Sequence, residues 1–94
     1  MAPQSIEHQI RQFIIEVFLF GQGGDNLSSR ESLLGRGIID STGVLEVVAF
    51  LERTWNLQVE DEELVPDNFD SIDKLVGFVE RKLRVAPTEL RVPA

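Results

Sequence analysis

The sequence predicts an all-α fold, a four-helix bundle with three main helices, one short third helix and a long first loop. Apolar residues recur three or four positions apart in three separate segments, which is the spacing of one buried helix face. Stretches rich in glycine, proline and polar residues separate these segments. The one candidate strand, within residues 57–70, would have no partner of comparable length, so no sheet is expected.

The first helix is expected over residues 4–20, with Pro3 just before it and Ser5 as a candidate cap. Its apolar stripe comprises Ile6, Ile10, Phe13, Ile14, Val17, Phe18 and Phe20. The segment 21–29 ends the helix, because its three glycines and polar residues are typical of a loop. The loop continues to about Asp40. Its apolar residues are expected to hold it against the bundle: Leu33, Leu34, Ile38 and Ile39.

The second helix is expected over about residues 41–56, with Asn56 at its end. Its apolar stripe consists of Val44, Val47, Val48, Leu51 and Trp55. A turn or short helix is expected over residues 60–70. It is interrupted at Pro66, because proline lacks the backbone N–H that a helix interior requires.

The last helix is expected to begin near Ser71, capped by Asp70 or Ser71, and to end near Arg84. Basic residues near that end suit the negative end of the helix dipole. The stripe of this helix consists of Ile72, Leu75, Val76, Val79 and Leu83. Residues 85–94 contain two prolines and no apolar period. The predicted organisation is therefore one domain over residues 1–84 and a C-terminal tail over residues 85–94.

The charge of the chain argues against a nucleic-acid partner. Its 94 residues, enough for one small domain, carry 16 acidic and 9 basic side chains and a net charge of −7. Such a surface repels phosphate backbones and attracts basic protein surfaces. Arg53 is the sole base within residues 40–73. Ten acids lie in that range: Asp40, Glu46, Glu52, Glu60, Asp61, Glu62, Glu63, Asp67, Asp70 and Asp73.

Cysteine and long apolar runs are both missing from the sequence. Without cysteine there is no disulfide and no thiolate metal site. The apolar runs are too short to span a membrane, and no basic, apolar leader precedes the first helix. The expected compartment is therefore the cytoplasm.

Ser41 lies directly after Asp40 and directly before the apolar pattern of the second helix, and several roles are open to it. The commonest is a helix cap, in which Asp40 or Ser41 accepts a hydrogen bond from a free backbone N–H. A nucleophile is disfavoured, because IDSTG has isoleucine where G-x-S-x-G has its first glycine. The only histidine, His8, shows no sign of a serine partner and is expected to face solvent. A metal site is disfavoured, because the acid-rich segments lack the spacing of a calcium loop.

The remaining role for Ser41 is a site of covalent modification. A hydroxyl at a helix N-terminus is exposed, is held in place, and lies at the positive end of the helix dipole. That position favours an attached phosphate group. The sequence therefore predicts no catalytic residue and no metal ligand.

Two segments carry a resemblance to a known family. GIIDSTGVLEVVAFLE (residues 37–52) is similar to the segment around the modified serine of acyl carrier and peptidyl carrier proteins. In that family an Asp-Ser pair opens the second helix, and a glycine commonly stands shortly before it. NFDSIDKLVGFVE (residues 68–80) resembles the short third helix of the family and its entry to the fourth. In element order the resemblance covers about residues 4–84.

The resemblance implies that Ser41 carries 4′-phosphopantetheine through a phosphodiester, with Asp40 supporting the modification. A phosphopantetheinyl transferase would add this cofactor from coenzyme A, and its thiol would supply the sulfur that the chain lacks. Acyl or aminoacyl cargo would be carried as a thioester. The protein itself would be no enzyme, and a monomer is expected for such a shuttle.

The face of the second helix that the core does not use is expected to dock partner enzymes with basic surfaces. Those enzymes would load the cargo or condense it. Charge on this face should speed encounter more than it tightens the complex. The residues expected to form this docking strip are Thr42, Leu45, Glu46, Ala49 and Glu52.

Two positions depart from the family pattern. Thr42 stands where many members have leucine, and Gly43 stands where many fatty-acid carriers have an acid. Gly43 is expected to let a partner or the prosthetic arm approach closely. These departures favour a carrier of a specialised pathway, with an amino acid, a polyketide unit or an unusual acyl group as cargo, over ordinary fatty-acid synthesis.

Two alternatives stay open from the sequence. One is an unmodified acidic adaptor that binds a basic protein through the second helix. The other is a helical regulator that is phosphorylated on Ser41.

Overall fold

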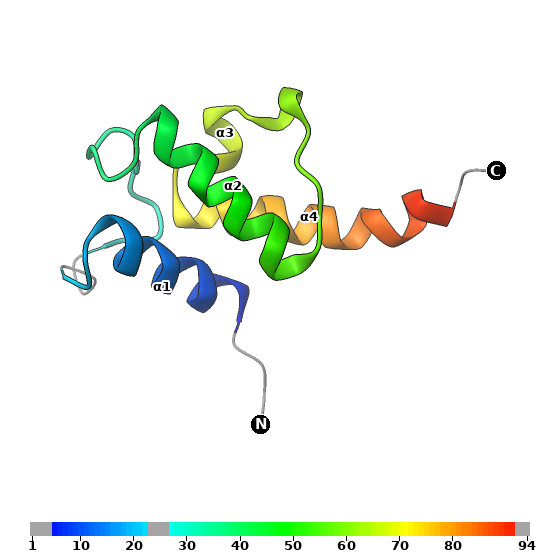
Figure 1. Ribbon diagram of the computed structural model, residues 1–94, viewed down its shortest axis with the longest axis horizontal. Helices are drawn as coiled ribbons and strands as arrows, with labels where there is room; N and C mark the ends of the chain where they lie inside the picture. The colour runs from blue at the N-terminus through cyan, green and yellow to red at the C-terminus, as the bar shows by residue number, and fades with distance from the viewer. Residues whose placement is uncertain (1–4, 23–26, 92–94) are drawn as a thin grey trace.

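The computed structural model of the chain describes residues 5–22 and 27–91, with side chains up to Arg84. Within these residues the structure contains helices and no strand, which confirms the predicted all-α fold with a short third helix (Figure 1). A long first loop joins the first two helices, as predicted. The helices are α1 (Ile6–Phe18), α2 (Ser41–Trp55), the 3₁₀ helix η2 (Asp61–Glu63), α3 (Pro66–Phe69) and α4 (Ile72–Arg91).

The helices begin where the local chemistry of the sequence places their starts. The Ser5 hydroxyl accepts a hydrogen bond from the His8 amide (3.0 Å) and caps α1. Pro66 is the first residue of α3, a position at which a helix N–H has no intrahelical partner and proline costs little. The Ser71 hydroxyl accepts from the Lys74 amide (3.1 Å) and caps α4.

The C-terminal end of α1 corrects two of the predicted core positions. The helix ends at Phe18, and Phe20 adopts a left-handed backbone conformation (φ 54°). The Gly21 amide donates back to the Ile15 carbonyl (2.8 Å), which closes the helix end. The apolar stripe therefore does not reach Phe20, which is 82% exposed. Val17, which is still inside the helix, is 38% exposed and lies outside the core.

The last helix is longer than the sequence predicts. α4 continues to Arg91 and does not stop near residue 84, and in Figure 1 its last turns project beyond the rest of the molecule. A proline in a helix interior lacks the N–H for one backbone hydrogen bond and crowds the carbonyl four residues before it, which can kink a helix without ending it. The division of the chain at residue 84 stays a prediction.

α4 is the central element of the core and packs against α1, α2 and α3. Apolar burial between these faces holds the bundle together, because helices of this length are marginal alone. The buried apolar side chains are Ile10, Ile14, Leu27, Leu33, Ile39, Val47, Leu51, Phe69, Ile72, Leu75, Phe78 and Val79. Leu83, predicted to belong to the stripe of α4, is 36% exposed.

α1 and α2 meet through aromatic rings. Phe13 of α1 stacks on Phe50 of α2 with ring centroids 4.1 Å apart. Phe18 meets Phe13 edge-on at 6.0 Å, and Trp55 meets Phe50 edge-on at 5.7 Å. Over the described part of the chain, no helix is both long and apolar enough to cross a membrane.

Candidate functional site: the Ser41 turn

The first turn of α2 is closed by Asp40 and not by Ser41. Asp40 is the N-cap, and its Oδ1 accepts a hydrogen bond from the Gly43 amide at 2.7 Å. Its carbonyl accepts from the Val44 amide at 2.9 Å. Ser41 is exposed at the first helical position, and no hydrogen bond found within residues 5–22 and 27–91 involves its hydroxyl. The cap is therefore assigned to Asp40, which leaves the serine oxygen free.

The loop that leads into Ser41 is tightly folded. The Leu33 carbonyl accepts from both the Ile38 amide (2.9 Å) and the Ile39 amide (3.3 Å). Gly37 reverses the chain with φ at 73°, a conformation that costs glycine little. Leu33 and Ile39 are buried, as the sequence predicts for this loop. We call residues 32–39 the serine loop.

Asp70 ties the serine loop to the junction between α3 and α4. Its Oδ2 accepts from the Ser32 hydroxyl at 2.7 Å, and its Oδ1 accepts from the Leu34 amide at 2.9 Å. The Asp70 carbonyl accepts from the Leu33 amide at 2.7 Å. One residue, 29 positions after Ser41 in the chain, therefore fixes the loop that precedes the serine.

An apolar hollow of about 270 Å³ opens beside Ser41 between α2, the serine loop and the segment of η2 and α3. Every side chain around it except Ser41 is apolar. The residues that line the hollow are Leu34, Ser41, Val44, Leu45, Leu64, Val65, Pro66 and Phe69. The arrangement places a free hydroxyl at the edge of an apolar surface, which suits the attachment of a flexible group whose apolar parts can lie against the protein.

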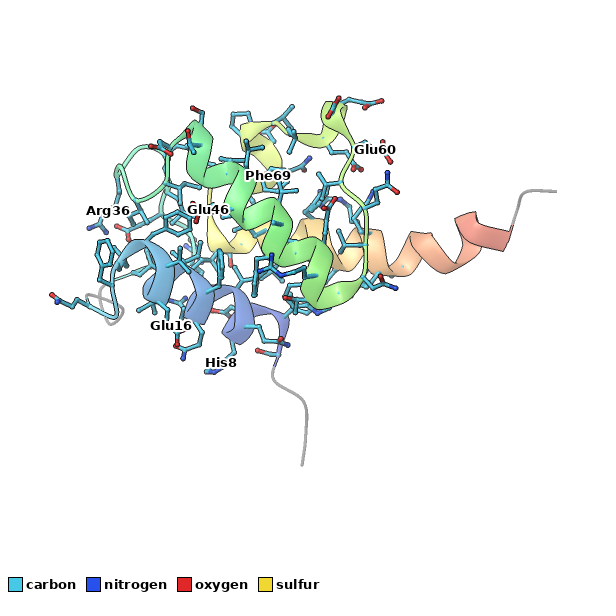
Figure 2. All side chains as sticks on the ribbon, in the orientation of Figure 1. His8, Glu16, Arg36, Glu46, Glu60 and Phe69 are labelled. Carbon is cyan, nitrogen blue, oxygen red and sulfur yellow. The ribbon has the colours of Figure 1, made fainter. Side chains whose placement is uncertain are left out.

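Sites of other kinds are not seen in the described residues. No group of three or more His, Asp or Glu side chains there could hold a metal ion. His8 is exposed, as predicted, and lies at the outer edge of α1 (Figure 2). The exposed free hydroxyl of Ser41 beside the apolar hollow is therefore the strongest candidate site.

Comparison with known proteins places the chain in a family. The D-alanyl carrier proteins of Streptococcus pyogenes serotypes M5 and M1 are each 33% identical to it over 73 residues, which cover 76% of this chain and 91% of the relative. The chain belongs to the acyl carrier protein family. The holo acyl carrier protein of Nitrosomonas europaea, solved by NMR in solution, superimposes with a TM-score of 0.70 at 30% identity. That match covers 87% of this chain and 99% of the other. No protein-family model matches the chain.

The docking strip predicted for this carrier protein divides into an open half and a covered half. Thr42, Leu45 and Glu46 are exposed, and Leu45 has 59% of its surface open to solvent. Figure 2 shows Glu46 on α2, in the half of the helix nearer Ser41. Ala49 and Glu52 are only half-exposed. Residues near the serine are thus the more accessible part of the strip.

Glu52 has an internal role that the sequence did not indicate. Its Oε2 accepts a hydrogen bond from the Val59 amide at 2.9 Å, across seven residues. This contact holds the chain that leaves α2 against the helix. The carboxylate is therefore engaged within the carrier protein, whereas Glu46 makes no hydrogen bond or ion pair among the residues that the structure describes.

The expectation for Gly43 needs correction. The glycine is buried, and a Cβ added there would lie 2.9 Å from Cε1 of Phe18. The space beside Gly43 is therefore occupied by an aromatic ring of the carrier protein itself, and it is not free for a partner or a prosthetic arm.

Leu64 and Val65 are candidate site residues that the sequence pattern did not reveal. They line the hollow beside Ser41 and are 37% and 41% exposed. They follow an acidic run and precede Pro66, outside any helical apolar stripe. An apolar pair without a periodic partner was the available signal, and large apolar side chains exposed next to a site indicate a contact surface.

The segment that carries these two residues is held to α4 by polar contacts. We call residues 60–69 the η2–α3 segment. Glu63 forms an ion pair with Lys82 (3.0 Å), and the Asn68 side chain accepts from Arg81 at 3.0 Å. Burial raises the pKa of Glu63, but the Glu60 amide and the Lys82 ammonium outweigh it, so the pKa lies below its ordinary 4.5.

Proposed function

We propose that this protein carries acyl or aminoacyl units as thioesters on 4′-phosphopantetheine attached to Ser41. The observation that carries the proposal is the exposed Ser41 hydroxyl, which the fold does not use because Asp40 supplies the cap. Membership of the acyl carrier protein family supports it. When attached, the cofactor supplies a thiol at the end of a flexible arm, the sulfur that a chain without cysteine lacks.

The residues around Ser41 fit such a cofactor. The serine oxygen is open to a transferase and lies at the N-terminus of the 15-residue helix α2, where the helix dipole favours a phosphodiester. Asp40 holds the turn in place through the Gly43 amide and supports the modification. The apolar hollow beside Ser41 offers a surface for the arm or for a short apolar cargo.

Partner enzymes would bind around the serine. Leu45, Leu64 and Val65 expose apolar surface, and Glu46 adds negative charge on the same helix as Leu45. Thr42 completes the open half of the strip, with Ala49 and Glu52 at its covered end. A phosphopantetheinyl transferase and the enzymes that load or condense the cargo would meet this surface through basic residues of their own, because opposite charge speeds encounter without preventing release.

Of the two cargo classes, an aminoacyl unit is our first choice. The relatives that are 33% identical are D-alanyl carrier proteins, which supports an amino acid, whereas the structural neighbour is a holo acyl carrier protein. Offering the modified protein amino acids with an adenylating ligase, and acyl groups in a parallel reaction, would separate the classes by the mass that is added.

Intact-mass spectrometry tests the proposal. Incubation with coenzyme A and a broad-specificity phosphopantetheinyl transferase should add one phosphopantetheine group to the wild-type chain. Ser41→Ala should abolish the addition and leave the thermal unfolding midpoint nearly unchanged, since Ser41 is not the cap. Ser28→Ala, at an exposed loop serine whose hydroxyl accepts from the Arg30 amide, is the control for loss of a serine, and this variant should still take up the cofactor on Ser41. If the wild-type chain takes up nothing, the unmodified acidic adaptor becomes the better account.

A further inference from the structure

A side chain from α1 supports the inner side of the Ser41 turn. A Cβ on Gly43 would lie 2.9 Å from Cε1 of Phe18, 3.4 Å from Oδ1 of Asp40 and 3.5 Å from Cβ of Ile39. The Phe18 ring therefore takes the space that a side chain at position 43 would need. The Asp40 carboxylate that caps α2 borders the same space.

The Phe18 ring is itself held in place by other aromatic side chains. It meets the Phe13 ring edge-on, with centroids 6.0 Å apart, and Phe13 stacks on Phe50 of α2 at 4.1 Å. Such aromatic pairs contribute beyond the apolar area that they bury. Phe18 is thus fixed by the α1–α2 contact on one side and faces the capped turn on the other.

We propose that Phe18 is a positioning residue for Ser41. Its ring, seated on Gly43, holds the Asp40-capped turn in the geometry in which the serine hydroxyl meets the transferase. Phe18 acts through Gly43 and Asp40, so it is not a catalytic residue. The consequence for cofactor transfer rests on the proposed function, whereas the contact between Phe18 and the turn does not.

The first test compares Phe18→Ala with Phe20→Ala, which removes a ring that is 82% exposed two residues away. Phe18→Ala should speed amide hydrogen exchange at Gly43 and Val44 about tenfold, with a much smaller change at the core residue Val79. The KM for the carrier in cofactor transfer should rise severalfold with kcat little changed, because a smaller fraction of molecules presents the competent turn. In Phe18→Leu the KM should return most of the way to the wild-type value, and Phe20→Ala should behave as wild type.

A second test uses a double-mutant cycle between positions 18 and 43. In the wild-type background, Gly43→Ala should lower the unfolding midpoint, because the new methyl group meets the Phe18 ring. In the Phe18→Ala background the same change should raise the midpoint, because the clash is gone and alanine favours a helix more than glycine does. A reversal of sign is expected only if the two residues touch.

The outcomes separate this inference from the proposed function. If the wild-type chain is never modified, the carrier proposal fails, yet the exchange rates and the cycle still decide whether Phe18 positions the turn. If Phe18→Ala speeds exchange at Gly43 and Val79 equally, the ring is a general core residue and the inference is overturned. The inference also fails if Gly43→Ala shifts the midpoint in the same direction in both backgrounds.

Discussion

The two walls of the hollow beside Ser41 are fixed by different kinds of contact. The serine loop is held by backbone amides that donate to Asp70 and by the buried side chains of Leu33 and Ile39. The η2–α3 segment is anchored at its end by the buried Phe69 ring, which meets the Phe78 ring of α4 with centroids 5.2 Å apart. Before Phe69 it is held to α4 by the ion pair of Glu63 with Lys82 and by the bond between Arg81 and Asn68. One wall therefore depends on packing and backbone geometry along its length, whereas the other depends on packing only at Phe69 and on partly exposed charges before it.

This difference indicates which wall can adjust. Hydrogen bonds that satisfy part-buried amides are expensive to break, because the amide then loses its partner away from water. Exposed ion pairs contribute little and weaken as salt is added. We therefore expect the serine loop to keep Ser41 in a constant place, while the part of the η2–α3 segment before Phe69 yields when something enters the hollow.

The largest expected effect is on the fixed wall. Asp70→Ala would leave the Leu34 amide and the Ser32 hydroxyl without their partner, at a cost of about 2 kcal/mol in the free energy of unfolding. Asp70→Asn is the matched control, since its side chain can still accept from Leu34 and donate to Ser32. Denaturant unfolding of both variants measures the difference. An Asn variant as unstable as the Ala variant would show that negative charge, and not hydrogen-bond geometry, fixes this wall.

A smaller effect is expected on the adjustable wall. Lys82→Met removes the cation that pairs with Glu63 but keeps an apolar side chain near the Phe78 ring, over which the ammonium lies at 5.8 Å. The free energy of unfolding should fall by about 0.5 kcal/mol at low salt and by less at high salt. Lys74→Met, at an exposed position of the same helix, controls for the loss of a positive charge. Equal losses at low and high salt would contradict the electrostatic account of this wall.

The smallest effect is the pH dependence of the same contact. Because the pKa of folded Glu63 lies below 4.5, its ionised form stabilises the fold at pH values above about 4.5. That contribution is lost as the pH falls through the lowered pKa. Glu63→Gln keeps an acceptor for the Glu60 amide but has no charge. The free energy of unfolding of the wild type should therefore exceed that of this variant by a few tenths of a kcal/mol at pH 7. Thermal unfolding between pH 7 and pH 3 should show the gap closing; a gap that widens in acid would contradict this prediction.

The helix starts were predictable because they depend on residues a few positions apart. Ser5 and Ser71 cap α1 and α4 through contacts within one turn. Ser41 was identified in the same way, from the Asp-Ser pair and the apolar pattern after it. Pro66 was predicted to interrupt a short helix, and it is instead the first residue of α3. The assignment of the cap to Asp40 also needed the structure.

The contacts between distant segments were not predictable from the sequence. Nothing in the local pattern indicates that Asp70 accepts from Ser32, 38 positions away, or that Phe18 lies on Gly43. Leu64 and Val65 were missed because their exposure beside Ser41 depends on how the η2–α3 segment folds over α2. Helical periodicity also predicted that α1 continues to Phe20, because the pattern does not reveal where the backbone turns left-handed.

At the start of α2 the cap and the proposed modification site are two different residues, and this separation has a thermodynamic consequence. The Asp40 side chain caps α2, whereas the Ser41 hydroxyl forms no hydrogen bond with the described residues. The serine oxygen therefore contributes nothing to the free energy of folding. Modification would therefore remove no contact from the folded chain, whereas a phosphodiester at this position would gain the favourable helix dipole only when α2 is formed. Attachment at this position would therefore cost no conformational stability and would add slightly to it.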